Sequence, residues 1–388
     1  MQNDDRVHYM DNLRALAMLA GVVFHAALAY SPFIHNYWPT ADAASSTLVD
    51  VLAWFVHLFR MPLFFLIAGF FAALLVRRHG IGGMLRNRLA RVFLPFLIFL
   101  PPVLGALNGL TAEAASSTRN LSPVLAWVKQ ATIEQGSLPA TPSVAHLWFL
   151  LYLMYFFVLV WVVSTLELKR LPAWLAQLRP GVLAGVAPLL LVPALASVGA
   201  PWPAPDFFLP QLWALVYFGF YFALGYLLFQ RQSLLEQLRP LTPYLLVLGL
   251  TAYGVFLQLM GTPRSGQALD WLQAALQAYA GLWLTLCSLQ AGKQWLNGRS
   301  GVMRYLADAS YWVYLVHLPI LFAIQYRLLD VVGGWPMKFA VSVLATSLLA
   351  LASYQLLVRH TFMGKLLGGR GFSARHPDST LANPNRAT

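Results

Sequence analysis

The sequence predicts an all-α polytopic membrane protein, a bundle of about ten transmembrane helices with both termini in the cytoplasm. Three observations lead to this prediction: an apolar composition, apolar runs long enough to cross a bilayer, and an unequal distribution of basic residues between alternate connections. They bear in turn on the solvent around the chain, on the number of crossings and on their direction.

The composition points to lipid as the main solvent of the chain. Of 388 residues, 59% are hydrophobic and only 10% are charged, and the mean hydropathy is +0.63. Soluble domains carry about 25% charged residues, so a soluble fold is not expected. The net charge of +12 falls in short basic blocks between apolar runs, which indicates membrane topology and no nucleic-acid partner. The single cysteine, Cys287, excludes an intrachain disulfide.

Apolar runs recur along the chain at lengths that suit membrane helices. A helix needs about 20 residues to cross the hydrocarbon core, because it rises about 1.5 Å per residue. The predicted spans are 9–31, 48–76, 90–111, 145–166, 181–199, 211–230, 241–260, 268–290, 302–325 and 336–358.

The connections between these spans differ strongly in basic residues. One alternate set contains Arg77, Arg78, Arg86, Arg88, Arg91, Lys169, Arg170, Arg179, Arg231, Arg239, Lys293, Arg299, Arg304, Arg359, Lys365 and Arg370. The other contains only Arg119, Lys129, Arg264, Arg327 and Lys338. The positive-inside rule therefore places the first set and both termini in the cytoplasm, which agrees with an even number of crossings.

Two segments outside the spans are predicted to form a short surface helix and a disordered tail. The outside connection 112–144 contains a possible short amphipathic helix at Pro123–Ala131, which could lie on the membrane surface as a lid. The C-terminal residues 367–388 are rich in Gly, Ser, Asn and Pro and are predicted to be a disordered cytoplasmic tail. No internal repeat stands out in the sequence, which weakens a transporter built from repeated halves.

Arg14 and His25 lie within the first predicted span and are candidates for function. They are separated by eleven positions, which returns to almost the same helix face about 16 Å further along. Arg14 is then near the cytoplasmic end and His25 in the outer half, an arrangement that suits a phosphate-bearing donor below and a proton acceptor above. The alternative is that Arg14 snorkels to lipid head groups and His25 is a packed histidine.

The second span carries His57 and Arg60 on one face, three residues apart. Arg60 lies near the predicted midplane, too deep to reach either surface easily, so it needs a partner or a wet cavity. Structural pairing with a carbonyl or carboxylate is the alternative explanation. Few other charges are available within the spans to pair with it, which favours a functional role.

Further candidates lie at the cytoplasmic start of the third span and in the outer half of two later ones. Arg86 and Arg88 suit bidentate phosphate recognition, although ordinary positive-inside anchoring explains them as well. The outer candidates are His146, Trp148, Tyr314 and His317. Each histidine alone is more often a packing residue, but together with His25, His57 and Arg60 they are expected to converge on one site.

Several of these segments resemble the membrane-bound acyltransferase 3 family. The resemblance rests on residues 10–17 with the spacing of Arg14 to His25, on the segment from Phe59 to Gly69, on Arg86 with Arg88, and on the segment from Ser310 to Pro319. The combination of His57-Leu-Phe-Arg60-Met with His146-Leu-Trp148-Phe-Leu more closely resembles the members that succinylate osmoregulated periplasmic glucans.

The resemblance implies an acyltransferase transmembrane domain over residues 1–366 in the bacterial inner membrane. It implies an acyl-CoA donor, a periplasmic glycan acceptor, succinyl or acetyl as the acyl group, and essential roles for His25 and Arg14. Arg86 and Arg88 would bind the donor. His25 would act as general base and Arg60 would stabilise the oxyanion or hold a succinyl carboxylate, while His57, Trp148, His146, Tyr314 and His317 would orient these groups or bind the acceptor.

The same residues are compatible with other readings of the chemistry and of the function. Transfer through a covalent acyl-histidine is an alternative to direct transfer. The competing function is a proton-coupled transporter of an anionic solute or glycan, with His25 and Arg60 in a relay. The sequence has no GxSxG, no HExxH and no metal-spaced cysteines, so no metal is expected. A homo-oligomer is neither indicated nor excluded.

Overall fold

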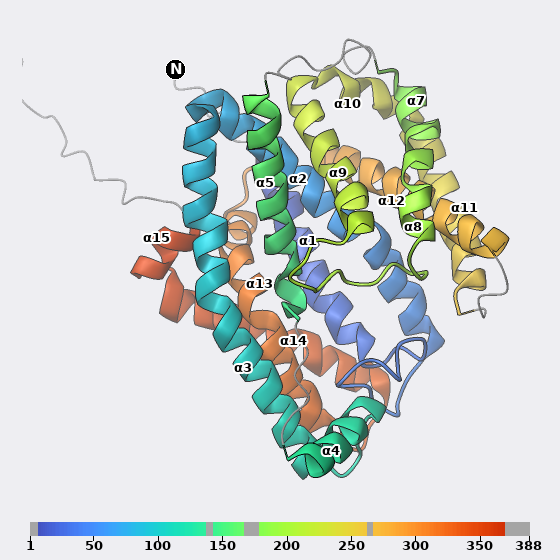
Figure 1. Cartoon of the computed structure of the whole chain (residues 1–388), viewed down its shortest axis with the longest axis vertical. Coiled ribbons are helices and arrows are strands. Elements are labelled where there is room, and N and C mark those ends of the chain that lie inside the picture. Colours follow the sequence, from blue (N-terminus) through green and yellow to red (C-terminus); the bar gives the residue numbers. More distant parts are fainter. Residues whose placement is uncertain (1–6, 137–142, 167–177, 262–266, 369–388) are drawn as a thin grey trace, which may run out of the picture.

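The computed structural model describes residues 7–136, 143–166, 178–261 and 267–368, and in these ranges the regular structure is entirely helical (Figure 1). Within the same ranges, seven helical stretches are long and apolar enough to cross a membrane. The predicted all-α, multi-pass membrane fold is therefore confirmed. The count of ten crossings and the cytoplasmic termini stay predictions, and Lys169, Arg170, Arg264 and 369–388 of the predicted tail lie outside the described residues.

Long helices form the body of the protein. They are α1 (His8–Leu28), α2 (Thr47–Arg88), α3 (Leu94–Ser117), α5 (Trp148–Thr165), α9 (Leu212–Gln230), α11 (Thr242–Leu259), α12 (Gln267–Trp295), α13 (Gly301–Leu328) and α14 (Trp335–Ser353). Shorter elements are α4 (Pro123–Gln135), α7 (Pro180–Gly185), α8 (Val192–Ala196), α10 (Ser233–Leu238), α15 (Phe362–Gly368), the 3₁₀ helices η2 (Ala145–Leu147), η3 (Ala187–Leu190) and η4 (Arg239–Leu241), and the π-helices η1 (Leu89–Phe93) and η5 (Tyr354–Val358).

The predicted span 181–199 is wrong as a single helix. In its place the chain forms three short helical pieces, α7, η3 and α8. Pro180, Pro188 and Pro193 each lie in the first turn of one piece. Proline has no amide hydrogen to donate and clashes with the preceding turn, so it begins a helix readily and interrupts one that is already running.

The second and third predicted spans belong to one nearly continuous helical stretch, Thr47–Ser117. Its direction changes at Gly80, which has φ +68° and ψ 179° inside α2. A glycine tolerates this positive φ without steric cost, and no atom lies within 4 Å of where its Cβ would be. The π-helix η1 then joins α2 to α3, so the segment that carries Arg91 and directly follows Arg88 is wound differently from an ordinary α-helix.

The helices α2 and α9 approach each other closely through two glycines. A Cβ at Gly69 would overlap the carbonyl oxygen of Phe222, and a Cβ at Gly225 would overlap that of Leu66. Small residues at facing positions let helix backbones approach and gain van der Waals contact, which is the main attraction available between helices in lipid. This contact fixes α2, the helix that carries Arg60.

α1 is the central element of the site. It packs against α2, α12, α13 and α14. The predicted short helix near Pro123 is confirmed as α4, with the Ser122 hydroxyl accepting from the Leu125 amide at its start and Gly136 in the left-handed region at its end. In Figure 1, α4 lies at the opposite end of the molecule from α10. Its predicted role as a surface lid stays a prediction.

Candidate active site

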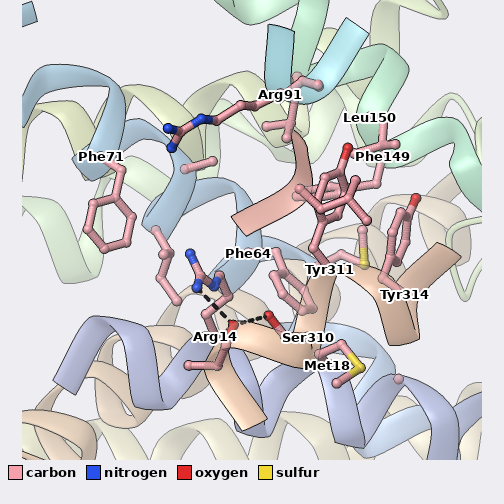
Figure 2. Close-up of a pocket in the computed structure, with 18 of the residues that line it drawn as sticks. Arg14, Met18, Phe64, Phe71, Arg91, Phe149, Leu150, Ser310, Tyr311 and Tyr314 are labelled. Atoms are coloured by element: carbon pink, nitrogen blue, oxygen red, sulfur yellow. Dashed lines mark hydrogen bonds between the residues drawn. The ribbon is translucent and has the colours of Figure 1, made fainter. Parts of the chain in front are cut away.

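A cavity of about 400 Å³ opens among α1, α2, α5, η1 and α13. Its charged and titratable lining separates into two groups. One group contains His25, Arg60, His146, Tyr314 and His317, and the other contains Arg14, Arg88, Arg91, Asp308 and Tyr311. The rest of the wall is mainly apolar, with Phe64, Phe71 and Phe149 among its members (Figure 2). A single cavity therefore joins the predicted outer histidines to the predicted inner arginines.

Three histidines from different elements meet at one end of this cavity. His25 Nδ1 on α1 lies 2.9 Å from His317 Nε2 on α13. The ring of His146, from η2, lies 5.0 Å from that of His317 in an edge-to-face arrangement. In the described part of the chain these histidines are not arranged as a metal-binding group. The geometry instead presents one imidazole hydrogen-bonded to another at the wall of a cavity, which suits proton transfer.

His146 is held in place by Tyr314. Its Nε2 donates to the Tyr314 carbonyl oxygen at 3.1 Å, and the Tyr314 hydroxyl donates to the His146 carbonyl oxygen at 2.6 Å. The preceding residue, Ala145, has φ +47°, a backbone conformation that non-glycine residues rarely adopt. Such strain persists only where surrounding contacts enforce it, and here the reciprocal bonds to Tyr314 do so.

Arg60 is the buried cation of the site. Its side chain is only 7% exposed, and its guanidinium carbon lies 4.7 Å from the centre of the Phe24 ring. Within the described ranges no hydrogen bond or ion pair satisfies its guanidinium, and its Nε is buried without a partner. An uncompensated buried charge is costly, so an anion bound in the cavity beside Arg60 would stabilise this side chain.

The other end of the cavity is built from three arginines. Arg14 on α1 donates to the Ala307 carbonyl oxygen at 3.1 Å and lies 3.5 Å from the Asp11 carboxylate. The Arg88 guanidinium lies over the Phe157 ring at 4.9 Å, and its Nε is buried without a partner. In the view of Figure 2, Arg14 and Arg91 lie toward the left of the cavity and Tyr311 and Tyr314 toward the right.

Two predicted site residues lie away from the cavity lining. Arg86 does not line it, whereas Arg88 and Arg91 do, because residues three apart share a helical face and residues two apart do not. His57 lies behind Phe24: its Nε2 donates to the Trp202 carbonyl oxygen at 3.0 Å and its ring stacks on Trp202 at 3.8 Å. The other predicted site residues, Trp148 included, all line the cavity.

Trp38 is a neighbour of His25 that sequence reasoning did not single out. Its ring plane is within 2° of the His25 plane, with ring centres 6.2 Å apart. It belongs to the connection between α1 and α2, which is pinned by a buried ion pair of 2.6 Å between Asp42 and Lys338. A tryptophan in an irregular connection gives no periodic signal, so only the tertiary structure places it over the histidine.

Comparisons with known proteins identify the family of the chain. A family profile described as an acyltransferase domain matches residues 7–355. The chain is 27% identical to glucans biosynthesis protein C of Salmonella typhimurium over 396 residues, covering 97% of this chain and 98% of that protein. It is 29% identical to the Salmonella typhi protein of the same name over 335 residues, covering 81% and 82%. No solved structure matches the chain significantly.

Proposed function

The chain belongs to the acyltransferase 3 family, and from this premise we propose that it moves an acyl group from cytoplasmic acyl-CoA to a hydroxyl of a periplasmic glycan. The observation that carries the proposal is the single cavity lined by Arg14, Arg88 and Arg91 at one end and by His25, His146 and His317 at the other. Family membership favours this reaction over the carrier alternative. The similarity to glucans biosynthesis protein C suggests a glucan as acceptor and the bacterial inner membrane as location.

The arginine end suits the phosphates of coenzyme A. Guanidinium groups bind phosphate oxygens through paired, charge-assisted hydrogen bonds. Arg14 and His25 are eleven residues apart on α1, a rise of about 16 Å, so an extended pantetheine arm can carry a thioester from the arginines up to the histidines. Since the positive-inside rule places the arginine end in the cytoplasm, the donor enters there and the acceptor enters from the opposite side.

His25 is the proposed general base. A neutral imidazole has a pKa near the working pH in water and can take the proton of a sugar hydroxyl as that oxygen attacks the thioester carbon. His25 and His317 both line the cavity, but His25 is partly exposed whereas His317 is only 3% exposed, so incoming groups reach His25 more readily.

Arg60 suggests the identity of the acyl group. A buried guanidinium without a carboxylate partner is stabilised by an anion that stays through the whole reaction, and the free carboxylate of a succinyl group supplies one. An acetyl group supplies none. We therefore propose succinyl as the preferred cargo, with Arg60 holding its terminal carboxylate.

The test uses purified protein in detergent with radiolabelled succinyl-CoA or acetyl-CoA and glucan acceptors. Wild type is expected to transfer succinyl faster than acetyl, and His25→Ala is expected to lose transfer of both, while the exposed-residue control His360→Ala keeps it. Arg60→Gln is expected to lose the preference for succinyl. If wild type neither binds nor deacylates acyl-CoA with any glycan acceptor, the proposed function is wrong. Mass spectrometry of envelope glycans from cells with and without the gene then identifies the product.

A further inference from the structure

The hydrogen bonds of His317 fix which of its nitrogens carries the proton. Its Nδ1 lies 2.8 Å from the Tyr314 carbonyl oxygen and 3.1 Å from that of Val313. Carbonyl oxygens accept hydrogen bonds and never donate them, so Nδ1 must be the protonated nitrogen. In a neutral imidazole the other nitrogen, Nε2, then has a free lone pair and can only accept.

This assignment determines the state of His25. His25 Nδ1 lies 2.9 Å from His317 Nε2, and the bond between them needs one donor and one acceptor. Since His317 Nε2 is the acceptor, His25 Nδ1 must donate. The lone pair of His25 is therefore on Nε2, for which the described part of the chain supplies no hydrogen-bond partner.

We infer that His317 is the positioning residue that holds His25 in the tautomer with a free Nε2, an inference that rests on the proposed role of His25 as general base. Two hydrogen bonds in series fix the direction of donation. His317 Nδ1 donates to the Tyr314 carbonyl oxygen, and His25 Nδ1 donates to His317 Nε2. The Tyr314 carbonyl oxygen also accepts from His146 Nε2 at 3.1 Å, so both buried histidines are anchored on the same backbone group.

The tautomer matters for each proton that moves in the reaction. The acceptor O–H bond breaks and its proton binds His25 Nε2, while the oxygen forms the new bond to the thioester carbon and the carbonyl π pair moves onto the carbonyl oxygen. The carbonyl then re-forms as the carbon–sulfur bond breaks, its electron pair leaves on sulfur, and His25 Nε2 returns the proton to that sulfur. Throughout, His25 Nδ1–H stays bonded to His317 Nε2, which stabilises the positive charge that His25 carries between the two steps.

Two variants of His317 separate its positioning role from its packing role. His317→Gln keeps a polar group able to accept from His25 Nδ1, whereas His317→Leu keeps the volume and removes the acceptor. We expect His317→Leu to lower kcat by about 100-fold or more with the KM for acyl-CoA within about twofold of wild type, and His317→Gln to recover most of that loss. His360→Leu, at an exposed position, is the matched control.

A second measurement does not depend on activity. Nitrogen-15 NMR of protein labelled at histidine distinguishes protonated from unprotonated ring nitrogens, and the His25 signals are identified by their loss in His25→Gln. Wild-type His25 is expected to carry its proton on Nδ1, and His317→Leu is expected to lose that preference. A wild-type His25 protonated on Nε2, or a His317→Leu variant that is folded and retains wild-type kcat, would overturn the inference. If wild type transfers no acyl group at all, the proposed function fails while the NMR result still decides the tautomer.

Discussion

Gly21 of α1 lies directly against Arg60 of α2: a Cβ on Gly21 would come within 2.6 Å of Arg60 Nη1. Because Gly21 has no side chain, the Arg60 guanidinium fits against α1 at this position. The two residues are on different helices, so the position of the cation depends on how closely α1 and α2 pack. The position of an anion bound by Arg60 therefore depends on Gly21 as well as on Arg60.

Gly21→Ala is expected to impair transfer of a succinyl group. The added methyl group forces the Arg60 guanidinium to shift, and a misplacement of about 1 Å at a reacting group can lower a rate by about 100-fold. We expect kcat/KM for succinyl-CoA to fall by about 10-fold or more, and the protein to remain folded because the displaced atom is the end of a flexible side chain. Initial rates in detergent measure the effect.

Gly105→Ala on α3 is the matched control, since no atom lies within 4 Å of the Cβ it would add. It is expected to leave the rate within about twofold, because alanine is slightly better than glycine in a helix. Equal rates for Gly21→Ala and wild type with succinyl-CoA would show that Arg60 does not hold the cargo.

Arg88 and Arg91 are expected to contribute more to donor binding than Arg86. Each charge-assisted hydrogen bond to a phosphate contributes about 1.5–3 kcal/mol, so Arg88→Ala and Arg91→Ala should each raise the Kd for coenzyme A by about 10-fold or more. Arg86→Ala should change it by less than about threefold, since Arg86 does not line the cavity. Isothermal titration of purified variants with coenzyme A measures all three. A larger effect at Arg86 than at Arg88 would place the donor elsewhere.

The fold class could be predicted from the sequence because lipid imposes a simple requirement. Every backbone polar group must be satisfied inside the segment, so long apolar runs become helices. The exception at 181–199 is instructive, because hydropathy windows count its apolar residues and ignore its prolines. Pro188 and Pro193 divide the run into pieces, each too short to cross the membrane.

The site was predictable in part, for a different reason. Charged and imidazole groups are rare in membrane helices, so composition alone singles out His25, Arg60 and His317. It does not reveal which of them share a cavity: His57 is on the same face of α2 as Arg60 but is separated from the cavity by Phe24. The sequence predicts Arg86 and Arg88 as donor-binding residues and does not reveal that Arg91 lines the cavity, because the π-helical winding of η1 has no clear sequence signal.

Gly225→Ala is expected to destabilise the packing of α2 on α9. The methyl group would overlap the carbonyl oxygen of Leu66, and backbone cannot yield as a side-chain end does. We expect a loss of about 1–3 kcal/mol or more in the free energy of unfolding, visible as a lower melting temperature in detergent. Gly254→Ala on α11, where the added atom meets open space, should leave it unchanged or slightly raised. Equal melting temperatures for Gly225→Ala and Gly254→Ala would contradict the close approach of the two helices.

The buried pair of Asp42 and Lys338 is expected to show strong coupling. Both side chains are nearly inaccessible, at 5% and 4% exposed. Lys338→Met leaves the Asp42 carboxylate buried without its cation, which costs about 3–5 kcal/mol. Adding Asp42→Asn removes that charge and should recover much of the loss, because the amide oxygen can still accept from the Ala44 amide.

Thermal unfolding of the two single variants and the double variant measures this coupling. Lys129→Met, at an exposed position on α4, is the control and should change stability by less than about 0.5 kcal/mol. Additive effects of the two single changes in the double variant would mean that the pair does not act as a unit. Since the pair pins the connection that carries Trp38, we also expect Lys338→Met to lower the transfer rate, and the double variant to recover part of it.

Asp330 is expected to make the start of the α4 region sensitive to pH. Its carboxylate accepts hydrogen bonds from the backbone amide of Asn120 at 2.9 Å and from the backbone amide of Arg119 at 3.1 Å. These two bonds lower the pKa of Asp330 below its ordinary value. A lowered pKa in the folded state means that the bonds contribute their full stabilisation above the ordinary pKa. That contribution is lost as the pH falls through the pKa of the folded state, because the protonated acid accepts these bonds less strongly. Hydrogen exchange of the Arg119 and Asn120 backbone amides, corrected for its intrinsic pH dependence, should therefore show protection near neutral pH and loss of that protection in acid.

Asp330→Asn should abolish this pH dependence, whereas Glu134→Gln, which changes an exposed carboxylate on α4, should retain it. Protection that does not change with pH in the wild-type protein would show that the Asp330 carboxylate does not anchor this segment.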